Sequence, residues 1–75
     1  MVIKYNKDVD SIYIEITKAK VAESDQEKKD VILDYDESGN IIGIEILNAS
    51  KKTNFPNGIR YEVAWKLLPF TMQFD

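Results

Sequence analysis

The sequence predicts a mainly β fold, a small antiparallel sheet of two hairpins plus a C-terminal strand. Ile12, Ile14 and Ile16 alternate with polar or aromatic neighbours, and a period of two built from β-branched residues is typical of a strand. Residues 59–67 alternate in the same way. Clusters of Asn, Asp and Gly separate these runs, as turns do. Since the chain has only 75 residues, we expect residues 1–75 to form a single domain.

The first hairpin is expected over residues 1–17. "MVIKY" is short and β-prone, "NKDVD" is rich in turn formers, and the strand with alternating isoleucines follows. The next segment, residues 18–30, is a highly charged connection that cannot bury much surface. We interpret it as a loop, with a polar edge strand around Val21–Ser24 as the alternative.

The second hairpin is expected over residues 31–47. Val31, Leu33 and Tyr35 alternate on the outgoing strand, and isoleucines alternate on the returning one. Between them lies "DESGN", in which we expect Gly39 or Asn40 to adopt positive φ, because both tolerate it at little cost.

The C-terminal segment, residues 48–75, leaves two structures open. Residues 59–67 have strand periodicity and many β-branched or aromatic residues, which favours a strand. Ile59, Val63 and Leu67 also share one helical stripe that Pro69 would end, so a helix over residues 58–68 packed on the sheet is the alternative.

A single sheet with one apolar face needs a cover in water. A C-terminal helix could cover that face within one chain, whereas a C-terminal strand would extend it and call for a second copy. We therefore expect a homodimer with Tyr61 and Trp65 at or near the interface. The residues expected on the apolar face are Ile3, Tyr5, Ile12, Ile14, Ile16, Leu33, Tyr35, Ile42, Ile44 and Ile46.

Composition excludes several kinds of chemistry. The chain contains neither cysteine nor histidine, so it has no disulfide, no Cys/His zinc site and no catalytic triad that uses imidazole or thiolate. A domain this small also has little room for a water-excluding cleft. These features predict a protein that is not an enzyme.

Charge and hydropathy bear on partners and location. The net charge is -3, which disfavours a nucleic-acid partner, and no apolar run approaches the ~20 residues that span a membrane. The N-terminus has no signal-peptide pattern, so we expect a cytoplasmic protein. The acids concentrate in residues 1–45, which favours solubility and would also suit a small basic protein as partner.

Residues 34–45 nearly match the loop pattern of a calcium-binding EF-hand. The match comprises Asp34, Asp36, Ser38, Gly39 and Glu45. An EF-hand loop needs a helix on each side, but both flanks of this stretch have a period of two. We expect a hairpin in which Tyr35 faces Ile42, with the register pairing Asp34 with Gly43 and Leu33 with Ile44. This hairpin would place Asp34, Asp36 and Glu45 on one polar face, so we expect no calcium site.

Two other interpretations of these side chains stay open as alternatives. Asp34, Asp36 and Glu45 could serve a carboxylate-dependent metal hydrolase, but a flat sheet face offers no concave site. The tyrosines together with Trp65 could stack on bases, but such platforms lie in basic grooves, so core or interface packing is expected instead.

Two stretches resemble a known family. "KYNKDVDSIYIEI" and "DVILDYDESGNIIGIEILNASK" are similar to the YuzE-like proteins, small bacterial and archaeal chains with domain of unknown function 2283. The resemblance covers about residues 1–52, and Asn6 stands where the family usually has Asp. The residues that carry it are Tyr5, Asp8, Asp10, Ile12, Tyr13, Ile14, Asp34, Tyr35, Asp36, Gly39, Asn40, Gly43, Glu45, Ile46, Ala49 and Ser50. The resemblance implies no catalytic residue and no cofactor, but it hints at an antitoxin-like partner of a small toxin-like protein.

The function expected from the sequence is a non-enzymatic binding or regulatory module without cofactor or metal. A metal hydrolase and a structural homo-oligomer are the alternatives. The candidate interaction residues are Asp34, Asp36, Glu45, Tyr61 and Trp65.

Overall fold

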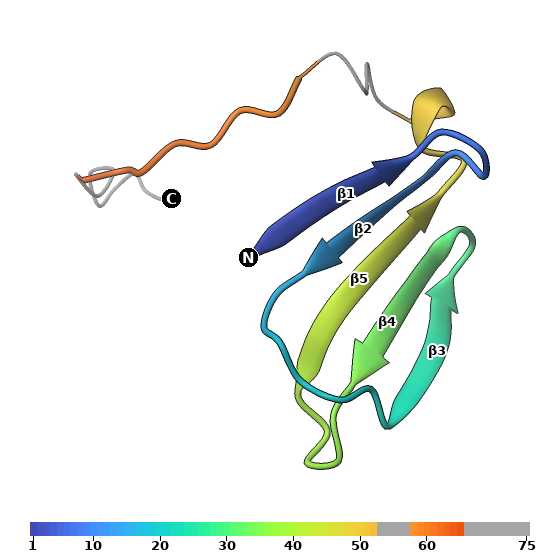
Figure 1. The fold of residues 1–75 in the computed structure, drawn as a ribbon, viewed down its shortest axis with the longest axis vertical. Coiled ribbons are helices and arrows are strands. Elements are labelled where there is room, and N and C mark those ends of the chain that lie inside the picture. Colours follow the sequence, from blue (N-terminus) through green and yellow to red (C-terminus); the bar gives the residue numbers. More distant parts are fainter. Residues whose placement is uncertain (53–57, 66–75) are drawn as a thin grey trace, which may run out of the picture.

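The computed structural model describes residues 1–52 and 58–65. Five antiparallel strands form one open sheet in the order β1-β2-β5-β4-β3 (Figure 1). The elements are β1 (Val2–Asn6), β2 (Ser11–Glu15), β3 (Glu23–Lys28), β4 (Val31–Tyr35), β5 (Ile41–Leu47) and the short 3-10 helix η1 (Ala49–Lys51). The predicted mainly β class is confirmed, and no helix in the described ranges is long and apolar enough to cross a bilayer.

The two predicted hairpins are joined through the middle strand, β5. β1 and β2 form the first hairpin, β4 and β5 form the second, and β2 pairs with β5 along its full length. In the second hairpin Asp34 faces Gly43 and Leu33 faces Ile44, as the sequence predicted. A β-bulge then shifts the register, so that Tyr35 faces Ile41 instead of Ile42.

The pairing register gathers isoleucines on one face of the sheet. Ile3 pairs with Ile14, Ile14 with Ile44, and Ile12 with Ile46. Paired residues in antiparallel strands point to the same side, so these side chains form one continuous apolar surface. Leu33 and Val31 extend it onto β4 through their pairing with Ile44 and Ile46.

The core of this single layer is thin. Among the described residues, Ile12, Ile42 and Ala49 are the buried apolar residues, with 4%, 2% and 0% of their surface exposed. The other isoleucines of the apolar face are half-buried, apart from Ile3, which is 38% exposed. The described part of the chain therefore contains no second layer over this face.

The charged connection contains a strand that the sequence did not predict at this position. β3 spans Glu23–Lys28 and pairs with β4, whereas the expected alternative was a polar strand around Val21–Ser24. Acidic and amide side chains are rare in strands, so local propensity carries no signal for β3. The backbone ladder to β4 decides the structure, and a bulge between Gln26 and Lys28 interrupts it.

The predicted C-terminal strand is absent from the described residues 58–65, and so is the alternative helix. Tyr61 and Trp65 expose 84% and 90% of their surface there. A strand needs a neighbouring strand for its backbone hydrogen bonds, and no described strand pairs with this segment. The remaining positions of both predictions, residues 66–68, lie outside the described residues.

Within the described ranges, four residues in turns or bends have positive φ. Gly39 has a φ of 86° in the turn between β4 and β5, which confirms the prediction made for this turn. Asp10, Asp30 and Asn48 have φ values of 52°, 66° and 53°. Asp and Asn are the non-glycine residues that best tolerate this conformation.

Candidate functional site

On the polar face, Tyr13 reaches across β5 to Asp34. The Tyr13 hydroxyl donates a hydrogen bond to Asp34 Oδ2 over 2.8 Å, although β2 and β4 are separated by the middle strand. The ring passes over Gly43, where an added Cβ would lie 2.7 Å from Tyr13 Cζ. Glycine is needed at this position because the two groups would otherwise overlap.

The other oxygen of Asp34 binds the edge strand. Ser24 Oγ on β3 donates to Asp34 Oδ1 over 2.6 Å. Asp34, on β4, therefore bonds through its side chain to both β2 and β3. The hydrogen bond to Asp34 is the largest cause that raises the pKa of Tyr13 to about 12, and burial adds to it.

The structure places Asp36 in the turn, apart from the polar face predicted for it. Its Oδ1 accepts hydrogen bonds from the backbone N–H groups of Ser38 and Asn40, each over 2.9 Å. Its Oδ2 accepts from Asn40 Nδ2 over 3.1 Å. The hydrogen bonds from Asn40 are the main cause that lowers the pKa of Asp36.

Glu45 does lie on the same face as Asp34. It pairs with Tyr13 on one side and Ile32 on the other, which places it diagonally from Asp34. Such diagonal neighbours are typically ~7–8 Å apart. Within residues 1–52 and 58–65, no three acidic side chains come together in a way that could hold a metal ion.

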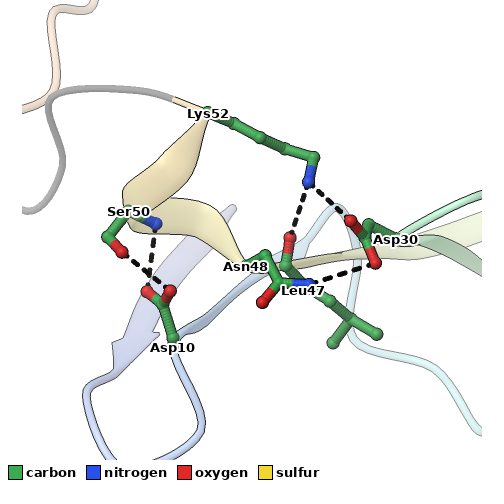
Figure 2. A network of polar contacts seen from close by, with 6 residues as sticks. All are labelled: Asp10, Asp30, Leu47, Asn48, Ser50 and Lys52. Carbon is green, nitrogen blue, oxygen red and sulfur yellow. Dashed lines mark hydrogen bonds and ion pairs between the residues drawn. The ribbon is translucent and has the colours of Figure 1, made fainter.

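Two aspartates at the far end of the sheet hold the segment after β5 (Figure 2). Asp10 is the last residue of the turn between β1 and β2, and its Oδ1 accepts from the backbone N–H of Ser50 over 3.0 Å. Its Oδ2 accepts from Ser50 Oγ over 2.8 Å, and Tyr5 Oη donates to Oδ1 over 2.8 Å. The Asp10 carbonyl accepts from the N–H of Ala49.

Asp30 plays the matching part at the turn between β3 and β4. Its Oδ2 pairs with Lys52 Nζ at 2.7 Å, and its Oδ1 accepts from Asn48 Nδ2 over 3.3 Å. Its carbonyl accepts from the N–H of Leu47 over 2.8 Å. Because β2 and β4 flank β5, Asp10 and Asp30 hold the chain from both sides as it leaves the sheet. We call this arrangement the aspartate clamp.

The hydrogen bonds of the clamp favour the ionised form of both carboxylates. The hydrogen bond from Tyr5, followed by that from Ser50, lowers the pKa of Asp10. The hydrogen bond from Lys52 is the main cause that lowers the pKa of Asp30. The sequence did not predict the clamp. Asp10 and Ser50 are separated by 40 positions and Asp30 and Lys52 by 22, and no local pattern shows that such distant residues meet.

The apolar face contains a hollow of about 450 Å³. Its lining is mostly aliphatic and comes from β1, β2, β4, β5 and residues 52 and 59. The residues that line it are Ile3, Ile12, Ile14, Val31, Ile46, Lys52 and Ile59. Contiguous apolar surface left open to solvent is a feature of many interaction sites.

A second hollow, of about 560 Å³, lies beside the turn between β4 and β5. Lys20, Asp36 and Glu37 are among the side chains that line it. The Asp36 carboxylate already accepts hydrogen bonds from the turn on both oxygens. The aspartate beside this hollow is therefore already engaged by the turn.

The family model described as "Protein of unknown function (DUF2283)" matches residues 2–50. The chain belongs to this family. The matched part of this DUF2283 chain contains all five strands and ends at Ser50, the partner of Asp10 in the clamp. The resemblance found in the sequence is thereby confirmed.

A similar protein among the curated sequences is itself uncharacterized. The DUF2283 chain is 44% identical over 41 residues to an uncharacterized protein of Methanocaldococcus jannaschii. The alignment covers 55% of this chain and 33% of the relative, so the chain spans about a third of that protein's length. No solved structure matches the chain.

Proposed function

We propose that this DUF2283 domain is a non-enzymatic binding module that acts through the apolar face of its sheet. The observation that carries the proposal is the apolar surface built by the register of β1, β2, β5 and β4, which no second layer covers in the described residues. An uncovered sheet of this kind gains stability when another molecule removes its aliphatic side chains from water.

The use of the carboxylates supports a binding role over catalysis. Asp34 accepts from Tyr13 and Ser24, and Asp36 accepts from its own turn. Asp10 and Asp30 hold the clamp. A general acid or base must be able to exchange protons with a substrate, and each of these groups is instead committed to holding the fold.

The border of the apolar face favours a protein partner with some basic character. Glu23 pairs with Tyr35, and Asp25 pairs with Leu33, so both acids point to the apolar side at the β3 edge. A partner surface that combines aliphatic side chains with flanking lysines or arginines would match both features.

A photo-crosslinking experiment in cells that express this protein tests the proposal. Ile3 and Lys4 are neighbours in β1 that point to opposite faces, since Ile3 pairs with Ile14 and Lys4 with Tyr13. A photoreactive amino acid at position 3 should yield a discrete cross-linked protein adduct, and the same residue at position 4 should not. Equal adducts from both positions, or none from either, would overturn the proposed function.

Mass spectrometry of the adduct then identifies the bound protein. A second copy of this chain and a different, small basic protein are both consistent with a binding module. The two results separate a self-associating domain from an antitoxin-like partner of another protein.

A further inference from the structure

We infer that the occupant of the apolar face is a second copy of this chain. Two sheets would pack face to face, and residues 58–65 of each copy would lie against the other. This inference rests on the proposed function, because it names the partner of the same face. Area, continuity and charge all favour a symmetric homodimer with one orientation of its axis.

The described chain offers no second layer of its own. Beyond the five strands it contains η1, which is three residues long, and the irregular segment 58–65. A three-residue helix cannot cover a five-stranded sheet, whose width is ~24 Å at ~4.8 Å per strand. A second identical sheet has the size and the aliphatic character to cover the first.

The two sheet faces alone are too small for a stable interface, so residues 58–65 must contribute to it. A face ~24 Å wide and ~17 Å long measures ~400 Å², so two faces together bury ~800 Å². Specific interfaces exceed ~1,000 Å², and ~1,600 Å² is typical. Tyr61 and Trp65 are large and exposed, and aromatic side chains bury ~150–250 Å² each. Two such pairs add ~600–1,000 Å², which brings the total to the usual range.

Residues 58–65 begin at the apolar face. Ile59 lines the same hollow as Ile3 and Ile14, so the segment is continuous with the surface that needs a cover. Ile59, Tyr61, Val63 and Trp65 alternate with polar or small residues and are 54–90% exposed. An extended segment with alternating apolar residues, and with no partner strand among the described residues of its own chain, has the form of an exchanged arm (Figure 1).

Charge selects the direction of the two-fold axis. The acidic strand β3 forms one edge of the sheet, and β1 forms the other. An axis running along the strands places each β3 over the β1 edge of the other copy. An axis running across the strands would place β3 over β3 and bring Glu23 and Asp25 against their own copies. Like charges placed opposite each other are costly, so the first arrangement is favoured.

Sedimentation equilibrium of the full chain between ~1 and ~100 µM tests the assembly. The expected mass is twice the 8.7 kDa of one chain. Ile3→Lys should raise the dimer dissociation constant at least ~10-fold, whereas Lys4→Glu on the opposite face of the same strand should leave it within ~2-fold. Trp65→Ala should also raise the dissociation constant at least ~10-fold. Because Trp65 is 90% exposed in the single chain, this substitution should not impair folding of the monomer.

Fluorescence supplies a second readout, since Trp65 is the single tryptophan. Its emission should move to shorter wavelength as the dimer forms and return to longer wavelength on dilution. A spin label at Asp25→Cys, in a chain free of other cysteines, should show two labels more than ~20 Å apart, whereas an axis across the strands would give ~10 Å.

The outcomes separate this inference from the proposed function. A monomer at all concentrations, with Trp65 buried or exposed, overturns the homodimer. If cross-linking from position 3 still captures another protein, the binding module survives without the homodimer. A dimer unaffected by both Ile3→Lys and Trp65→Ala would show that the copies meet elsewhere, which also overturns the inference.

Discussion

The ring of Tyr13 occupies the space in which a side chain at position 43 would begin. A Cβ at Gly43 would lie 2.7 Å from Cζ and 3.2 Å from Cε1 of that ring. The same approach lets the Tyr13 hydroxyl reach Asp34 on the far side of β5. The glycine in the middle strand is thus tied to a contact between its two neighbouring strands.

We expect Gly43→Ala to destabilise the fold by ~1–3 kcal/mol, because the new methyl group must displace the Tyr13 ring or the backbone. Urea denaturation followed by circular dichroism measures this free energy of unfolding. Gly58→Ala is the matched control, since no atom lies within 4 Å of a Cβ built there. The control should change the stability by less than ~0.5 kcal/mol. The cost of Gly43→Ala should shrink by more than ~1 kcal/mol in a Tyr13→Ala background, and equal costs in both backgrounds would refute the steric account.

Alkaline pH should weaken the link between Tyr13 and Asp34. Folding raises the pKa of Tyr13 from 10.0 to about 12. The stabilisation from the neutral phenol is therefore complete below pH 10 and is lost as the pH rises towards 12. Tyr13→Phe lacks this group, so the stability difference between the wild type and the variant should fall across that window. Chemical denaturation at pH 8, 10 and 11.5 measures the difference, and a constant difference would contradict the assignment.

The strands with strong periodicity were predictable because burial of one face dictates a period of two. Ile12 and Ile14 on β2 lie on the apolar face together with Ile44 and Ile46 on β5, as the sequence indicated. The turn at Gly39 was predictable for a different reason, since few residues adopt positive φ cheaply.

The parts that escaped prediction depend on contacts between distant residues. β3 is polar along its whole length, and its position comes from backbone pairing with β4 and from the bond between Ser24 and Asp34. The pairing of β2 with β5 and the clamp from Asp10 to Ser50 likewise join residues far apart in sequence. The alternation in residues 59–67 led to the opposite error, because periodicity shows that a segment suits a strand without showing that a partner strand exists.

Acid should loosen the aspartate clamp. The hydrogen bonds from Tyr5 and Ser50 lower the pKa of Asp10 below its ordinary value of 3.8. Its stabilisation is therefore fully present above pH 3.8 and is lost as the pH falls through the lower, folded-state pKa. Asp10→Asn tolerates the same positive φ but cannot ionise. The stability advantage of the wild type over this variant should vanish between pH 4 and pH 2.

Equilibrium denaturation across that pH range measures the effect, with Asp8→Asn as the control. Asp8 belongs to the same turn, but its carboxylate accepts none of the hydrogen bonds that hold η1. Its stability difference from the wild type should show no comparable loss. If Asp10→Asn matches the wild type at pH 7, the carboxylate does not hold the segment after β5.

The resemblance of residues 34–45 to a calcium loop should have no functional counterpart. Strands β4 and β5 flank the turn, where an EF-hand requires two helices. Asp36 directs its oxygens to the turn backbone and to Asn40, whereas Asp34 binds Tyr13 and Ser24 on the polar face. We expect calorimetric titration with Ca²⁺ to show no site tighter than ~1 mM, the weak end of natural calcium modules.

Asp36→Ala should lower stability through the lost turn bonds and leave the calcium titration unchanged. A micromolar site in the wild type that disappears in Asp36→Ala would mean that the turn reorganises around the ion, and that Asp36 binds calcium instead of serving only to hold the turn.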